Sequence, residues 1–305
     1  MLEILRHSNG KLETLAEPEK ECWINVASPT DEEIKRLKSI INIPDEILPS
    51  LKDIDEVPIF ERHEKFIFII TRAPYNNLNN EFEYYTVPVG IFISDDYVVT
   101  LSYFENDAIE RVKSQTFPLG KKQIAFNLFL VSAKLYLSYL NEIKKKMYAL
   151  ELTLEKSQKN QVIMQLLELE KSLVYFNTSL TSNDILIRAI AKDGKLVKAY
   201  DEMRLIQKIA YETKQGIEMT TIYSNILSNT LDAFASVISN NLSIVIKILT
   251  SITIVLSLPT LIASVYGMNI ELPFQHLSNA FLIIMLMSFG ISFLSVILLW
   301  RYRSF

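Results

Sequence analysis

The chain is poor in several kinds of residue, and each shortage excludes something. Cys22 is the only cysteine among 305 residues, so neither an intrachain disulfide nor a metal site built on paired cysteines is possible. The formal net charge of −4 argues against a nucleic-acid partner, because such a partner normally calls for a basic face. The amino-terminal residues lack the apolar region of a secretion signal, so we expect everything ahead of the first apolar span to remain in the cytoplasm.

Two stretches near the carboxyl terminus lack charged residues altogether. The first lies between Lys247 and Glu271, and the second covers residues 277–300. Either is long enough to cross the roughly 30 Å hydrocarbon layer of a bilayer as a helix. Lys247 precedes the first span, Arg301 and Arg303 follow the second, and the loop between them has no lysine or arginine. By the positive-inside rule, we expect both termini in the cytoplasm and the loop outside.

Periodicity divides the rest of the chain. Residues 1–118 show short strand patterns and a capping box formed by Thr30 and Glu33, which predict an α+β cytoplasmic domain. That domain offers neither a nucleophile beside a base nor a phosphate-binding glycine loop, so we expect no enzyme. Residues 119–241 follow a helical period and predict long cytoplasmic helices. The last of these helices should run on without a break into the first apolar span and end near Gly267, which makes it about 70 residues and roughly 100 Å long. An apolar seam predicts packing on another helix of the same subunit: Val162, Leu166, Leu169, Leu173 and Phe176.

Small hydroxyl side chains recur along the first span. Thr253, Ser257, Thr260 and Ser264 are spaced by four, three and four residues, so they lie on one face of a helix. We call them the hydroxyl stripe. Such residues let transmembrane helices pack closely, and they equally suit a face that lines a water-filled pore. The stripe alone leaves both interpretations open.

The end of the first span carries a resemblance. Tyr266, Gly267, Met268 and Asn269 directly follow the charge-free stretch, and a second span comes soon after. This combination resembles the signature of the CorA family of magnesium channels. The resemblance implies a homopentameric, funnel-shaped channel for Mg²⁺ in the inner or plasma membrane, with Co²⁺ and Ni²⁺ as further ions. Residues 242–269 are then the pore-lining helix, 270–276 the external loop, 277–300 the second transmembrane helix and 301–305 a basic cytoplasmic tail.

The resemblance also assigns roles to residues along the first span. Five copies of Asn269, with the carbonyls of Gly267 and Met268, would form a selectivity filter that holds Mg²⁺ through its bound waters. Gly267 is expected to let the chain turn there at little steric cost. Below the filter, the hydroxyl stripe would offer further oxygens. Ile246 and Leu249 continue the same face inward, and this register suits either a hydrophobic gate or ordinary helix packing. At the two ends, Asp232 would form a cytoplasmic entrance ring and Glu271 would attract cations in the external loop.

Regulation and rival functions remain open at this point. Apart from Mg²⁺ as transported ion and candidate regulator, we expect no cofactor; the expected partners are other copies of the chain, the bilayer and divalent cations. Where the family places an acidic regulatory pair, this sequence has Ser50 and Lys208. Five nearby acidic residues either substitute for the pair or form a solvated face, which we favour: Asp45, Glu46, Asp53, Asp55 and Glu56. A zinc transporter of the same superfamily and a membrane-anchored sensor or scaffold are the alternatives.

Overall fold

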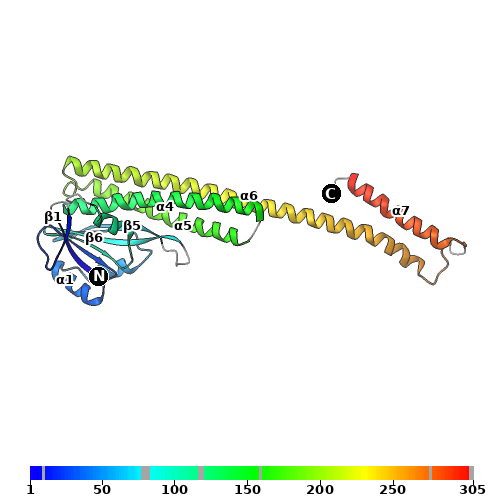
Figure 1. The fold of residues 1–305 in the computed structure, drawn as a ribbon, viewed down its shortest axis with the longest axis horizontal. Coiled ribbons are helices and arrows are strands. Elements are labelled where there is room, and N and C mark those ends of the chain that lie inside the picture. Colours follow the sequence, from blue (N-terminus) through cyan, green and yellow to red (C-terminus); the bar gives the residue numbers. More distant parts are fainter. Residues whose placement is uncertain (9–10, 77–82, 116–119, 158–159, 275–276, 302–305) are drawn as a thin grey trace. The chain divides into compact units, whose positions relative to one another are not determined.

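The computed structural model describes residues 1–8, 11–76, 83–115, 120–157, 160–274 and 277–301 (Figure 1). The chain forms two compact units, Met1–Asn229 and Thr230–Phe305. The strands are β1 (Leu2–Ser8), β2 (Lys11–Leu15), β3 (Cys22–Ala27), β4 (Ile59–Arg62), β5 (Phe66–Asn76), β6 (Tyr84–Ser94) and β7 (Tyr97–Ser102). The helices are α1 (Asp31–Ile41), α2 (Ile47–Lys52), α3 (Asp107–Lys113), α4 (Lys121–Ser157), α5 (Asn160–Ala191), α6 (Tyr200–Tyr266) and α7 (Ala280–Arg301).

A seven-stranded sheet organises the first unit. Its strand order is β2-β1-β3-β7-β6-β5-β4, and all neighbours are antiparallel except β3 and β7. The parallel pair sets Ile24 opposite Val99, which are both fully buried. Parallel pairing requires a long crossover, and here the chain between β3 and β7 supplies α1, α2 and the β5–β6 hairpin. Strands β6 and β7 pair as an antiparallel hairpin across a turn at residues 95–96.

Helices α1 and α2 cover one face of this sheet (Figure 1). The predicted capping box starts α1: Glu33 N–H donates to Thr30 Oγ1, and Thr30 N–H donates to Glu33 Oε2. A left-handed residue, Asn42, ends the helix, and Ile34, Leu37 and Ile41 turn toward the sheet. The N–H bonds from Thr30 to Glu33 lower the pKa of that carboxyl.

Helices α4 and α5 form an antiparallel pair over the opposite face (Figure 1). The predicted seam is confirmed, since its five residues are all buried in the first unit. Helix α4 is long and apolar enough to cross a membrane, but 72% of its most apolar window is buried inside the chain. Its apolar surface is therefore already covered by protein. Because α4 and α5 pack on the sheet, residues 119–229 belong to the same compact unit as residues 1–118.

One glycine lets α2 approach the sheet closely. A Cβ added to Gly90 in β6 would lie 2.7 Å from Cδ1 of Leu51, whose side chain is fully buried. We expect Gly90→Val to lower the free energy of unfolding by roughly 2 kcal/mol, because overpacking a rigid core forces side chains off their rotamers. Chemical denaturation of the full chain in detergent would measure it. Gly194→Ala is the matched control, since an added Cβ there meets no atom within 4 Å; an equal loss in both variants would contradict the packing account.

Candidate functional site

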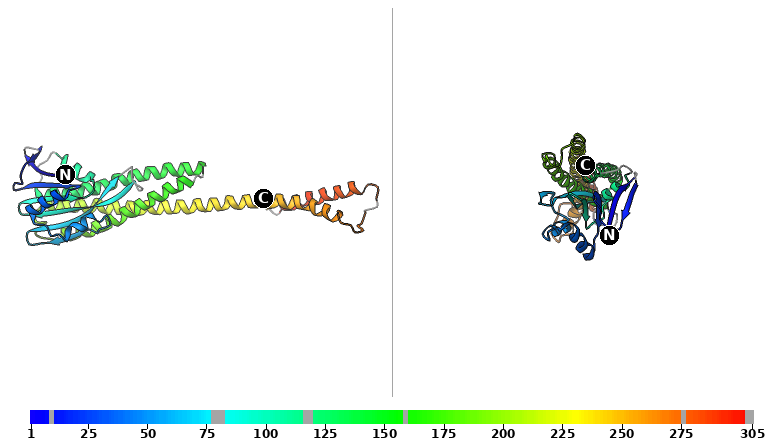
Figure 2. Two further views of the ribbon diagram at one scale, coloured as in Figure 1. Left: turned by 90° about the horizontal axis from the view of Figure 1, so that it is seen from below. Right: turned by 90° about the vertical axis from the view of Figure 1, so that its left-hand side faces the viewer.

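The second unit consists of the carboxyl-terminal part of α6 and the whole of α7, which lie side by side (Figures 1 and 2). Both helices are long and apolar enough to cross a membrane. In contrast to α4, only 6% of the most apolar window of α6 and 11% of that of α7 are buried within the chain. A single copy therefore leaves most of both apolar windows uncovered by its own chain.

Helix α7 and the hydroxyl stripe occupy opposite faces of α6. The α7 side is marked by Ser251, which is 3% exposed, and by Val255 and Ile262, which are partly covered. Thr253 follows Ser251 by two residues, and two residues turn an α-helix by about 200°. The whole stripe is exposed, so it takes no part in packing the two helices of one subunit. This removes the intrasubunit form of the packing interpretation.

Three of the four stripe hydroxyls, at Thr253, Ser257 and Thr260, are oriented to accept hydrogen bonds from outside. Thr253 Oγ1 donates to Leu249 O at 2.8 Å, and Thr260 Oγ1 donates to Leu256 O at 3.0 Å. Ser257 Oγ likewise donates to Ile254 O at 2.9 Å. A hydroxyl that gives its one proton to its own helix has only lone pairs left to offer outward. An open groove of about 680 Å³ runs along this surface; Thr253, Ser257, Thr260 and Ser264 line it with Leu256, Leu258 and Leu261.

The outer end of α6 is tied to the loop that follows it. The helix ends at Tyr266, and the Tyr266 hydroxyl donates to Pro273 O at 3.2 Å. Met268 and Asn269 lie inside the loop so closed, and both are exposed. Gly267 continues the helical bonding, with its N–H donating to Ala263 O at 2.9 Å. The bond from Tyr266 to Pro273 thus fixes the path of the segment that carries Asn269.

The expectation for Gly267 needs a correction. Its φ does not lie in the left-handed region, and an added Cβ would meet only Ala263 O at 3.4 Å and Ser264 O at 3.5 Å. These are ordinary van der Waals contacts, so the turn itself does not require glycine in one subunit. The other predicted positions are found where helical spacing puts them. Ile246 and Leu249 are 53% and 63% exposed on the stripe side of α6, and Asp232 is exposed near the start of the second unit. Glu271 is exposed in the loop, whereas Gln275 and His276 fall outside the described residues.

The hydrogen bond from the Tyr266 hydroxyl to Pro273 O can be removed by a single substitution. Tyr266→Phe removes only the hydroxyl, and with it the hydrogen bond that holds the loop at Pro273. Because this bond holds the segment that carries Asn269, we expect the half-saturating Mg²⁺ concentration for uptake to rise about threefold to tenfold, as for the loss of one neutral hydrogen bond. Uptake into liposomes at graded Mg²⁺ measures this. Tyr223→Phe, on the amino-terminal part of α6, is the control, and identical saturation curves for both variants would refute the positioning role.

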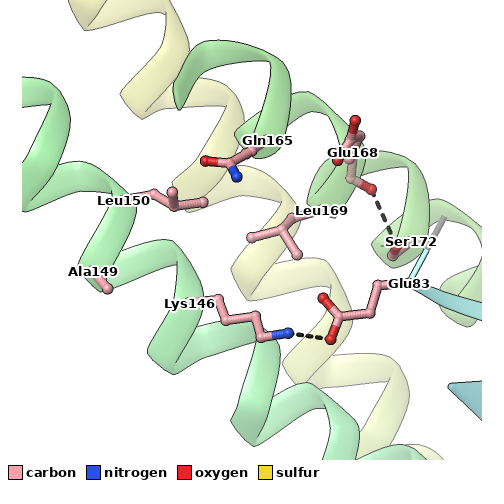
Figure 3. Close-up of a pocket in the computed structure, with 8 residues that line it drawn as sticks. All are labelled: Glu83, Lys146, Ala149, Leu150, Gln165, Glu168, Leu169 and Ser172. Carbon is pink, nitrogen blue, oxygen red and sulfur yellow. Dashed lines mark hydrogen bonds and ion pairs between the residues drawn. The ribbon is translucent and has the colours of Figure 1, made fainter. Parts of the chain in front are cut away.

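The first unit holds a cavity of about 320 Å³ between α4 and α5 (Figure 3). Glu83 and Lys146 form an ion pair at its edge, and the Lys146 ammonium also lies 5.1 Å from the centre of the Tyr84 ring. The Glu168 carboxylate points away from that of Glu83 (Figure 3). The two carboxylates do not converge on a common point, so the cavity provides no pair for a metal ion or for acid–base chemistry.

The acidic residues near α2 are engaged locally. Asp45 pairs with Lys38, and Asp53 Oδ1 accepts from Asp55 N at 2.9 Å. Glu56 Oε1 accepts from the N–H of Val57 at 3.1 Å. Across the described ranges, no three His, Cys, Asp or Glu side chains lie close enough together to hold a metal ion. These contacts favour the interpretation as a solvated face.

Two polar clusters were missed by sequence reasoning. Arg72 in β5 is 6% exposed and binds side chains of β6 and α5; burial lowers its pKa, and the nearby carboxylates oppose that shift. The second cluster is Ser251, Ser288 and Ser292, at the contact of α6 with α7. A weak signal for it exists in the sequence, since serine among large apolar residues often marks a close helix contact.

Known proteins share this architecture. A cobalt/magnesium transport protein CorA from Methanocaldococcus jannaschii is 28% identical over 272 residues, which cover 86% of this chain and 84% of that protein. A magnesium transport protein CorA from Wolinella succinogenes is 22% identical over 281 residues, covering 88% and 86%. The complete structure of the CorA magnesium transporter from Methanocaldococcus jannaschii superposes with a TM-score of 0.86 at 24% identity, over 99% of this chain and 98% of that one, which establishes a common fold.

Sequence-profile comparison decides the family. Residues 19–302 match the profile described as CorA-like Mg²⁺ transporter protein, which is nearly the whole chain. The predicted family and the predicted fold, an α+β unit followed by long helices and two carboxyl-terminal apolar helices, are thereby confirmed. The chain belongs to the family of CorA-like Mg²⁺ transporter proteins.

Proposed function

We propose that five copies of this chain form a channel through which hydrated Mg²⁺ enters the cell down its electrochemical gradient. The observation that carries the proposal is the position of the hydroxyl stripe, which is exposed on the face of α6 opposite α7. Two helices from one subunit cannot enclose a water-filled path, so the stripe needs copies of itself around an axis. The number five comes from the family resemblance.

Hydrated Mg²⁺ suits a path lined by neutral oxygen acceptors. The ion dehydrates reluctantly and keeps most of its waters when it binds. Those waters present protons outward, and the stripe hydroxyls present lone pairs. At the outer end, the Asn269 side-chain oxygen and the carbonyls of Gly267 and Met268 would form the filter. Neutral acceptors hold the hydrated ion long enough to select it and loosely enough to release it.

Further inward, the chemistry of the same face changes. Ile246 and Leu249 would close the path as an apolar constriction, because a narrow apolar ring excludes water and ions together. Below them, five Asp232 carboxylates would raise the local cation concentration at the cytoplasmic end, and Glu271 would do so at the outer end. We expect Ile246→Asn to raise the leak of Mg²⁺ through the closed path, because a wetted ring no longer excludes ions. Efflux from preloaded liposomes measures this leak, and an unchanged rate would place the gate elsewhere.

The driving force requires no pump. A divalent cation gains about 4.6 kcal/mol on entering a cell whose interior is about 100 mV negative, at about 2.3 kcal/mol per charge. This is enough to hold a concentration gradient of more than about a thousandfold. The charges at Lys247 and Arg301, with an intervening loop that has no basic residue, favour cytoplasmic termini in a plasma or inner membrane.

Ion flux tests this function directly. The full chain would be reconstituted in liposomes that contain a Mg²⁺-sensitive dye, and an inside-negative potential would be applied. We expect Mg²⁺ uptake that depends on the protein and is inhibited by Co²⁺ and Ni²⁺. Uptake of Zn²⁺ in place of Mg²⁺ would favour the zinc transporter. Folded oligomers that pass neither ion would favour the anchored sensor, and native mass spectrometry of the same sample would count the subunits.

A further inference from the structure

Helix α6 has one interruption in its backbone hydrogen bonding within the apolar span. Pro259 lies inside the helix and has no N–H, so the carbonyl of Val255, four residues earlier, loses its helical partner. A backbone carbonyl without a partner is costly where no water can reach it. A side chain of the other helix reaches this carbonyl: Ser292 Oγ of α7 lies 3.4 Å from Val255 O.

The Ser292 hydroxyl is shared between two acceptors. It lies 3.0 Å from Ser288 O, one turn earlier in its own helix, and the longer contact reaches Val255 O. In transmembrane helices, serine side chains and neighbouring helices commonly satisfy the carbonyl that a proline frees. The shared geometry makes this a weak bond, but it is a recorded polar contact from α7 to the backbone of α6.

Burial in the second unit falls on small polar residues of both helices. Within the described part of residues 230–301, three polar residues are buried: Ser251, Ser288 and Ser292, at 3%, 6% and 7% exposed. Their small side chains allow the helices to approach closely. Most of the larger apolar residues of α7 are exposed in the single chain. The α6–α7 contact therefore includes small residues of both helices, and Ser292 is the one whose side chain lies 3.4 Å from the carbonyl that the proline frees.

We propose that Ser292 is a positioning residue for the pore helix. It takes over the carbonyl that Pro259 leaves free, and α7 thereby sets the direction of the segment that runs from Thr260 to Asn269. This inference rests on the proposed function, because the proposed function places the selectivity filter in that segment. Helix α7 is then more than a membrane anchor, since it stabilises α6 at Pro259, where the pore-lining helix lacks one backbone hydrogen bond.

A small change in helix direction at Pro259 displaces the segment that follows it. Tyr266, the last residue of α6, lies seven residues beyond Pro259, which is about 10 Å along the helix. A change of about 10° in direction at the proline would then move Tyr266, and the start of the loop that carries Asn269, by roughly 2 Å. Kinks at proline vary readily, because one bond of the helical ladder is missing there. A filter built from five such segments would lose its common geometry if each joint were free.

The test compares two serines of the same helix. Ser292→Ala removes the contact with α6, whereas Ser295→Ala removes a hydroxyl whose recorded bond, to Ile291 O at 2.9 Å, stays within α7. Hydrogen exchange of full-length protein in liposomes would report on residues 256–263 of α6. We expect about threefold faster exchange there for Ser292→Ala, as for one shared hydrogen bond between membrane helices, and no change for Ser295→Ala. The half-saturating Mg²⁺ concentration for uptake should shift in the same ratio.

A second variant separates positioning from ordinary packing. Pro259→Ala restores an N–H that can bond Val255 O, so Ser292 has nothing left to supply. In this background, Ser292→Ala should change neither hydrogen exchange nor half-saturation. The inference is overturned if Ser292→Ala matches Ser295→Ala in hydrogen exchange, or if its effect persists in full beside Pro259→Ala. Failure of the wild type to pass Mg²⁺ would overturn the proposed function alone, because hydrogen exchange decides the role of Ser292 without transport.

Discussion

Asn269→Ala is expected to abolish Mg²⁺ uptake while the variant folds and assembles as the wild type does. Asn269 is exposed in the loop that follows α6, so the substitution removes no packing within the subunit. The loss should be large, because a hydrogen bond to a charged group contributes about 1.5 to 3 kcal/mol. If the ion's waters lose only two such bonds, binding at the filter falls more than about a hundredfold. Dye-reported uptake into liposomes under an inside-negative potential measures the rate.

Asn279→Ala is the matched control for this experiment. Asn279 is also an exposed asparagine between the two helices, and its backbone carbonyl accepts from Ile283 N, a contact that the substitution keeps. Uptake by this variant should equal that of the wild type. If Asn269→Ala retained wild-type uptake, or if both variants lost it equally, the filter would not lie at Asn269.

Arg72→Met is expected to destabilise the first unit by roughly 3 to 5 kcal/mol. The guanidinium donates from Nε to Ser179 Oγ at 2.9 Å, from Nη1 to Glu56 O at 2.7 Å and from Nη2 to Thr86 Oγ1 at 2.7 Å. Methionine fills similar space but leaves these three oxygens with a missing donor, at about 1 to 3 kcal/mol for each buried group that stays unpaired. Urea denaturation of the full chain in detergent, followed by circular dichroism, measures the loss.

Arg188→Met provides the comparison for Arg72. Arg188 is 70% exposed in α5 and pairs with Asp184 one turn away, so its removal should change the free energy of unfolding by less than about 0.5 kcal/mol. A similarly small change for Arg72→Met would show that the buried network contributes little. The buried Arg72 would then contribute no more to the free energy of unfolding than the exposed Arg188.

Local rules predicted much of this structure. The Thr30 capping box, the five-residue seam of α5 and the 67-residue helix α6 follow from spacing within one segment, which sequence displays directly. Strand β5 continues past Arg72 to Asn76, and partners from β6 and α5 surround this buried arginine. Those partners lie up to 107 residues away in sequence, so no local pattern contains them.

The second unit shows the same limit. The period of the hydroxyl stripe is a property of one helix, and the sequence displayed it. Which face of α6 meets α7 depends on Ser251, Ser288 and Ser292, which are small residues on two helices with no shared period. The structure shows which face of α6 packs against α7, and the hydroxyl stripe therefore lies on the face that α7 leaves uncovered.

Cysteine accessibility tests most directly whether the hydroxyl stripe lines a water-filled path. The native Cys22 is buried, so an introduced cysteine should be the one that reacts. Ser257→Cys would lie on the stripe and Ser251→Cys on the α7 side of the same helix. In liposomes, we expect a membrane-impermeant thiol reagent to modify the cysteine at 257 and block Mg²⁺ uptake, and to leave the cysteine at 251 unmodified. Modification at 251 with protection at 257 would contradict the account, because the stripe would then face protein or lipid.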